Sequence, residues 1–378
     1  MVGPLLAERF PGLRYAAALL GPGSEVAGLD SERSTDHNWG PRLQVLLSAD
    51  DPADDPDDPG GGSGGGSGGD FNGGPDGRAA AVTAMLTSRL PSSFRGYPVA
   101  FPLSGEPDSA ARHHVVVSEL GAWLTGLLGF DPRRGVTLLD WLATPTQRLA
   151  EFTAGAVFRD DPGELTRARR DLAWYPRDVW LYLLACQWRR IEQEEAFPGR
   201  CAEAGDDLGS VIVTARLARD LMRLCLLMHR RYPPYSKWLG TASARLPGSP
   251  GPSASPSASL AASLSAALSA TGWPAREHHL GDAYRRVAAR HNQLGLTPPL
   301  DTGTRPFYDR PYQVIEAARF TTALRAAISD PRIAALPLTG AVDQFTDSTD
   351  AAGDLPLLRA CVAAAIRPER EPPGAPGA

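Results

Sequence analysis

A glycine-serine pair and a polar tripeptide stand close together near the start of the chain, at Gly23-Ser24 and Asp36-His37-Asn38. Glycine lets an anion approach the main chain, and serine adds a hydroxyl group and an N–H donor, so the pair suits a phosphate. Alternate side chains of a strand point to the same side, which puts those of Asp36 and Asn38 together. Mg²⁺ takes oxygen ligands of this kind along with substrate phosphates. The combination predicts a phosphate site with Mg²⁺, whereas a Gly-Ser turn alone is common without any ligand.

The residues around these motifs predict a small sheet with helices. Apolar or β-branched runs of strand length occur at 43–48 and 113–120, and further short strands are expected at 99–101 and 152–160. Helix-like stretches lie between these runs. Strands interleaved with helices favour an α/β or α+β sheet domain.

The sequence becomes helical from residue 176 onward. Apolar residues recur at helical spacing in four long segments, at 176–197, 208–232, 281–295 and 311–328. Such segments favour a helix bundle. We therefore predict an α+β protein, with a small mixed sheet and flanking helices followed by an all-helical domain.

Two segments rich in proline, glycine and serine divide the chain. We expect a sheet domain at 1–160 that contains a disordered acidic and Gly/Ser-rich insertion at 50–77. A helical domain at 161–335 contains a Pro/Ser/Ala-rich linker at 246–270, which leads into a weak helix. A C-terminal segment and tail occupy 336–378.

The overall charge and the cysteines narrow the possible partners and compartments. Lys and Arg number 38 against 43 Asp and Glu, for a net charge of -5, so no basic surface for a nucleic-acid backbone is expected. The chain has neither an apolar run long enough for a membrane span nor a signal-peptide pattern. Four cysteines without a Cys-x-x-Cys pair suit a reducing cytoplasm. We predict a cytoplasmic protein without nucleic-acid or membrane partners.

Two pairs of adjacent histidines, His113-His114 and His278-His279, are candidates for zinc ligands. Adjacent side chains point apart on a strand or a helix, and we expect no acidic or cysteine partner at ligand spacing. The sequence therefore does not predict a zinc site at either pair.

The spacing of the first motifs resembles a known superfamily. Asp36 follows Ser24 by twelve residues, and Gly-Ser followed by an acidic pair at this distance resembles the polymerase-β-like nucleotidyltransferases. The stretch from Gly21 to Arg42 also looks like part of one bacterial family, as do "DVWLYLLACQWRRIEQEEAF" and "ARDLMRLCLLMHRRYPPYSKWLGTA". That family is the domain of unknown function 4037, which is assigned to the nucleotidyltransferase fold.

The resemblance implies roles for residues at matching positions. Gly23 and Ser24 would hold the triphosphate of a nucleotide, Asp36 and Asn38 would hold Mg²⁺, and Arg42 would counter phosphate charge. The implied reaction transfers a nucleoside monophosphate from a nucleoside triphosphate (NTP) to a hydroxyl group of a small molecule or a protein. The resemblance does not identify the acceptor or the preferred nucleotide.

Two positions depart from the superfamily pattern. Asn38 stands where a second acid is expected, and Val116 stands where a third acid is expected on the neighbouring strand. Glu119 is the nearest acid, but its odd separation from Val116 turns it to the other side of the strand. These departures predict weakened transfer. The alternative is an inactive homologue that binds a nucleotide or a partner protein.

The helical domain offers a second set of candidates. Glu194 and Glu195 are candidate bases for the acceptor hydroxyl, and Lys237, between aromatic neighbours, is a candidate nucleotide-binding residue. The competing interpretation is that the glutamates are solvated, with Arg190 and Glu194 in a surface pair one helical turn apart.

Overall fold

The computed structural model describes five stretches of the chain, residues 1–31, 40–48, 75–101, 111–246 and 259–367. They form two compact units. The fold is α+β, with a small mixed sheet and many helices, as predicted. No helix within the five stretches has both the length and the apolar character that a membrane span requires.

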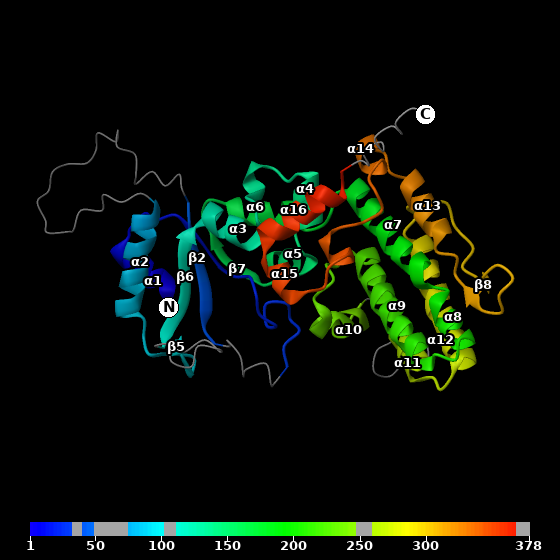
Figure 1. The fold of residues 1–378 in the computed structure, drawn as a ribbon. Coiled ribbons are helices and arrows are strands. Elements are labelled where there is room, and N and C mark those ends of the chain that lie inside the picture. The colour runs from blue at the N-terminus through cyan, green and yellow to red at the C-terminus, as the bar shows by residue number, and fades with distance from the viewer. Residues whose placement is uncertain (32–39, 49–74, 102–110, 247–258, 368–378) are drawn as a thin grey trace, which may run out of the picture. The chain divides into compact units, whose positions relative to one another are not determined.

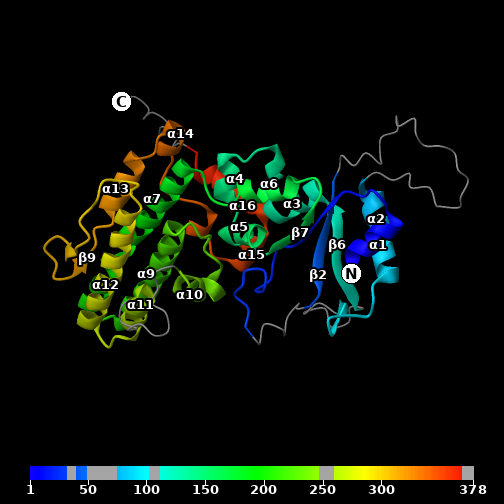
Figure 2. The same cartoon turned by 180° about the vertical axis from the view of Figure 1, so that it is seen from behind.

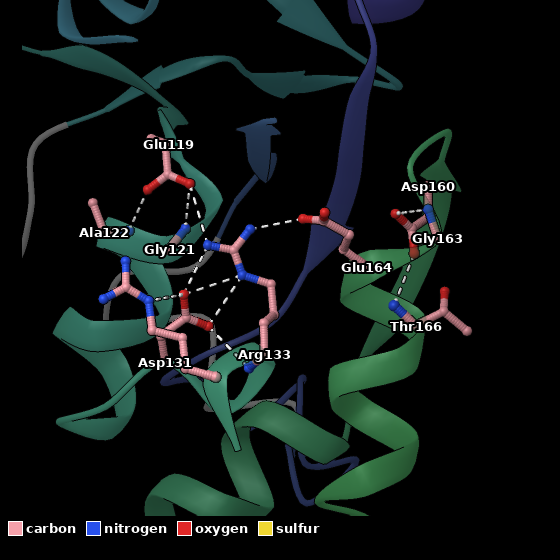
Figure 3. A network of polar contacts seen from close by, with 10 residues as sticks. Glu119, Gly121, Ala122, Asp131, Arg133, Asp160, Gly163, Glu164 and Thr166 are labelled. Carbon is pink, nitrogen blue, oxygen red and sulfur yellow. Dashed lines mark hydrogen bonds and ion pairs between the residues drawn. The ribbon is translucent and has the colours of Figure 1, made fainter. Parts of the chain in front are cut away.

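The first unit comprises Met1–Val136 and Arg148–Ala173, and the second comprises Thr137–Gln147 and the described residues from Trp174 onward. The first unit extends beyond residue 160, the predicted boundary, because helix α6 (Glu164–Asp171) is bound to the strand before it. The Asp160 carboxylate accepts hydrogen bonds from the N–H groups of Gly163 at 3.1 Å and Thr166 at 2.8 Å (Figure 3).

The five-stranded sheet of the first unit has the order β5-β6-β2-β1-β7. Strands β2 and β6 are parallel, and the other neighbouring pairs are antiparallel. The predicted strands are confirmed, although the last begins at Ala156 because Phe152 belongs to helix α5. The bounds are β1 Tyr15–Leu19, β2 Arg42–Leu47, β5 Ala100–Phe101, β6 Arg112–Glu119, β7 Ala156–Asp160 and α5 Thr146–Thr153.

Helices α1 (Val2–Arg9) and α2 (Pro75–Arg89) cover one face of this sheet (Figure 1). Their apolar side chains pack against Tyr15, Val45 and Val115, which are buried on that face. Because side chains alternate along a strand, the residues next to these point to the opposite face. Helix α3 (Leu120–Leu128) begins directly after β6, and the short elements between α2 and α4 are β3 Ser93–Phe94, β4 Tyr97–Pro98 and η3 Pro132–Arg134.

The second unit is a helical bundle with one short hairpin. Helices α7, α9 and α12 lie side by side in both views, and α13 packs on α7 (Figures 1 and 2). Trp188 of α7 stacks on Phe320 of α13 with ring centroids 4.2 Å apart. The bounds are α4 Leu138–Ala143, α7 Arg177–Glu194, α8 Phe197–Glu203, α9 Asp207–Met228, α10 Ser236–Ala244, α11 Leu260–Ser269, α12 Trp273–Gln293, α13 Ala318–Ala326, α14 Pro331–Ala334, η5 Val342–Gln344, α15 Thr349–Gly353 and α16 Leu355–Ala365.

Three predicted segments differ from the structure in their extent. The predicted helix at 311–328 is split, since β9 (Gln313–Val314) pairs with β8 (Arg305–Pro306) before α13 begins. Residues 75–77 of the predicted insertion belong to α2, and the rest of 50–77 lies outside the described residues. The C-terminal half of the predicted linker is α11, the weak helix that the sequence indicated, and 247–258 lies outside the described residues.

Candidate functional site

The register of the sheet brings the Gly-Ser turn to the start of β2. Strand β1 runs antiparallel to β2, with Ala18 opposite Gln44, so the end of β1 and the start of β2 lie at the same edge. Strand β6 begins there too, because Arg42 pairs with His114. We call the turn 21–29 together with the start of β2 the Gly-Ser edge.

The backbone of the turn requires glycine at Gly23. Its φ is 152°, and a Cβ there would overlap the guanidinium of Arg42 and the carboxylate of Glu25. The carbonyl of Ser24 accepts a hydrogen bond from Leu29 N–H at 2.9 Å, which closes the turn. The turn is therefore held in a fixed position beside β2.

Arg42 connects the start of β2 to this turn. Its guanidinium donates a hydrogen bond to the carbonyl of Pro22 at 3.0 Å and forms an ion pair with Glu25. The structure thus places the predicted cation Arg42 next to Gly23. The sequence motifs did not predict a role for Glu25. The one feature of the sequence that could have pointed to this residue is its position directly after Gly23-Ser24. A phosphate that binds here has to share Arg42 with this carboxylate or replace it.

Asp36 and Asn38, the predicted Mg²⁺ ligands, lie outside the described residues. The described chain resumes at Gly40, two residues before β2. After the gap, Gly40 packs against the ring of Phe101 with no room for a Cβ, so the entry to β2 is fixed.

Val116 lies on the face of the sheet away from α1 and α2, at a locally exposed position. It pairs with Gln44 across the parallel strands, opposite to the face covered by α1 and α2, and is 48% exposed. Glu119 pairs with Leu47, at the far end of β6 from the Gly-Ser edge. Its carboxylate accepts hydrogen bonds from the N–H groups of Gly121 at 2.7 Å and Ala122 at 2.6 Å, so it caps α3 and does not replace the third acid (Figure 3).

A network of carboxylates surrounds Arg133 at that far end of the sheet (Figure 3). The guanidinium contacts Glu119 at 3.4 Å, Asp131 at 2.8 Å and Glu164 at 2.7 Å. Partial burial opposes ionisation of Asp131, but the hydrogen bonds and charge of Arg133 leave its pKa below the usual range. Because Arg133 pairs with all three carboxylates, the network links β6 and α3 to α6 and has a structural role.

Two of the predicted residues in the second unit differ in burial, since Glu194 is half-buried and Lys237 is exposed. Lys237 is exposed, and its ammonium group lies 5.1 Å from the ring centroid of Trp238. Glu194 forms an ion pair with Arg216 of α9, whereas Arg190 donates to the carbonyl of Gln344. The expected surface pair between Arg190 and Glu194 is therefore replaced by an interhelical pair.

Glu195 is buried, contrary to the interpretation that the glutamates are solvated. It is 6% exposed, and its carboxylate accepts hydrogen bonds from the N–H groups of Glu316 at 3.0 Å and Ala317 at 3.1 Å. It therefore caps the start of α13. Burial raises the pKa of Glu195 to about 7, against the opposing effect of these hydrogen bonds.

This burial gives the stability of the chain a pH dependence. The pKa of Glu195 in the folded chain is about 7, above its ordinary value of 4.5, so the folded state binds more protons between these values. The contribution of Glu195 to stability is full below pH 4.5 and is lost as the pH rises through 7. The free energy of unfolding of the wild type minus that of Glu195→Gln should fall by about 3 kcal/mol from pH 4 to pH 8. Urea unfolding at several pH values measures this difference, and a constant difference would contradict it.

The geometry defines an α+β protein with a glycine-containing turn at one sheet edge and a helical second unit. Residues 141–239 match the model of a family described as a domain of unknown function (DUF4037). The match runs from Trp141 in α4 to Leu239 in α10, so it includes Glu194, Glu195 and Lys237 but not the Gly-Ser edge. No curated protein and no solved structure matches the chain at a significant level. The predicted likeness to this domain of unknown function is confirmed over that stretch.

Proposed function

We propose that the first unit binds an NTP with Mg²⁺ at the Gly-Ser edge and is a nucleotidyltransferase-like protein. The observation that carries this proposal is the contact of Arg42 with the turn at Gly23. This contact places a cation beside a turn whose backbone conformation at Gly23 favours glycine, at the start of β2. Glycine-containing turns and arginine are common in phosphate-binding sites.

Each residue of the edge has a distinct part in this proposal. Ser24 offers its hydroxyl group and N–H to phosphate oxygens, and Arg42 balances their charge. Asp36 and Asn38 would hold Mg²⁺, which, when bound, supplies charge stabilisation at the transferred phosphoryl group. The acceptor is a hydroxyl group of a small molecule or a protein, and slow transfer is expected because two acids are replaced.

The second candidate is a binding module that takes up the nucleotide, or a partner protein, without transfer. The exposed Val116 favours it, because this position carries no carboxylate. Glu119 cannot compensate from the far end of β6. Binding without release of pyrophosphate would support this candidate over the enzyme.

Calorimetric titration of ATP and GTP, with and without Mg²⁺, tests the binding that both candidates share. We expect Mg²⁺-dependent binding with a dissociation constant between about 1 μM and 1 mM, the range of KM values of most enzymes. Arg42→Gln should abolish this binding. Arg134→Gln, at a largely exposed arginine of the same unit, is the matched control and should bind as the wild type does. Absence of binding in the wild type would overturn the nucleotide site.

Removal of the competing carboxylate at Glu25 should strengthen nucleotide binding. In Glu25→Gln the guanidinium of Arg42 loses its ion pair and becomes free for a phosphate. We expect ATP to bind about tenfold more tightly, equivalent to roughly 1.4 kcal/mol. Glu8→Gln changes the net charge of the first unit equally, at the exposed pair with Arg89, and should leave the affinity unchanged. Weaker binding by Glu25→Gln would show that the carboxylate itself takes part in the site.

A further inference from the structure

Helix α12 carries three potential metal ligands within one turn. One ligand atom each of His278, His279 and Asp282 lies within 4.8 Å of those of the other two, and the Nε2 of His278 is 3.7 Å from Oδ2 of Asp282. His278 is exposed, and the other two are half-buried. No other group of three or more such ligands comes together within the described stretches.

The spacing of the three residues explains why they converge. Each residue of an α-helix is rotated by about 100° from the one before it. Relative to His278, Asp282 therefore points about 40° around the helix, and His279 points about 100° around it. Asp282 lies between the two histidines, one turn further along, and both imidazoles can reach it. The expectation that no acidic partner stands at ligand spacing from His278-His279 is therefore wrong, because Asp282 lies one turn further along α12.

The distances are close to those of a tetrahedral zinc site. Zinc binds histidine nitrogen and carboxylate oxygen at about 2.0–2.2 Å, which puts two ligand atoms of a tetrahedron about 3.4 Å apart. The pair formed by His278 and Asp282 is already near this length. The remaining pairs need to approach by at most roughly 1–1.5 Å, which rotation of a solvent-accessible imidazole provides.

We propose that His278, His279 and Asp282 bind a divalent transition metal, with Zn²⁺ as its representative. Two nitrogens and one oxygen form a donor set that suits zinc, and the fourth position is left to water. Arg285 donates a hydrogen bond to the other oxygen of Asp282 at 2.6 Å. This contact orients the carboxylate, while the positive charge of the guanidinium opposes the metal. The site is independent of the nucleotide proposal.

Zn²⁺ titration of the full chain without a histidine tag tests the site, with calorimetry as the readout. We expect one Zn²⁺ per chain. His278→Ala, His279→Ala and Asp282→Asn should each weaken binding by about tenfold or more, since even the loss of an outer-shell partner costs that much. Arg285→Gln should strengthen it. Circular dichroism of each variant confirms that α12 is retained.

His113→Ala, which alters the other histidine pair, is the matched control and should bind Zn²⁺ as the wild type does. Substitution of Co²⁺ for Zn²⁺ should give visible bands without the near-ultraviolet absorption of a thiolate ligand. The proposal is overturned if the three ligand variants keep the wild-type affinity, if His113→Ala loses it, or if thiolate absorption shows that cysteines hold the metal.

Discussion

A chain that carries both Asn38→Asp and Val116→Asp is expected to bind ATP with Mg²⁺ about 10- to 100-fold more tightly than the wild type. It should also release pyrophosphate faster. The reason is charge. Asparagine offers Mg²⁺ a neutral oxygen, and valine offers none, whereas the double variant restores two anionic ligands. The prediction rests on the proposed nucleotide site and is its most demanding test.

The structure shows that the sheet tolerates an acid at Val116. The side chain is 48% exposed, so an aspartate there stays in contact with water and costs little stability. Its neighbour Gln44 is neutral, and the amide group of Gln44 already bonds to Leu20, donating to the carbonyl at 3.1 Å and accepting from the N–H at 2.8 Å. No described acid lies directly across the strand pair to repel the new carboxylate.

Titration calorimetry and a pyrophosphate-release assay measure the two effects. The matched control combines Asn38→Asp with Val116→Asn, which has nearly the same shape as aspartate but no charge. The two single variants should lie between the wild type and the double variant. Equal binding by the double variant and its asparagine control would show that position 116 does not face the metal, and the resemblance to the acidic pattern would fail at that strand.

The sequence predicted correctly those helices and strands that have a clear pattern of apolar residues within their own length. The β-branched run of β6 and the helical spacing of α7 are read directly from the chain. The start of β7 was placed too early, at Phe152. Gly155 has a φ of 67°, and a Cβ on it would overlap the carbonyl of Leu19. This close approach of two distant backbones ends α5, and no pattern within 152–160 reveals it.

Long-range contacts explain the remaining differences. The segment 311–328 has a continuous helical pattern, but α13 starts only at Ala318. Glu195, which is 121 and 122 residues away in the sequence, accepts hydrogen bonds from the N–H groups of the two residues directly before α13. Glu316 also has a positive φ of 55°, a conformation that a helical pattern does not indicate. The same limit applies to the candidate site. The resemblance implies that Arg42 lies near the Gly-Ser turn, but only the folded chain shows that Arg42 forms an ion pair with Glu25.

Replacement of Arg276 by alanine should destabilise the second unit by about 3–5 kcal/mol. The side chain is 0% exposed at the start of α12. It donates to Asp207 and Ser210 of α9, both at 2.9 Å, and to the carbonyl of Ala270 at 3.2 Å, so it joins three helices. Alanine leaves a cavity and removes all three hydrogen bonds.

Urea unfolding of the full chain measures this loss, and two further variants separate its causes. Arg276→Met retains most of the volume without the hydrogen bonds, and Arg276→Lys retains the charge without the planar fork that reaches three acceptors at once. We expect both to lie between alanine and the wild type. Arg231→Ala, at an exposed arginine of the same unit outside α12, should change the free energy of unfolding by less than about 0.5 kcal/mol. If Arg276→Ala also changes the free energy of unfolding by less than about 0.5 kcal/mol, the three hydrogen bonds do not hold α9, α11 and α12 together.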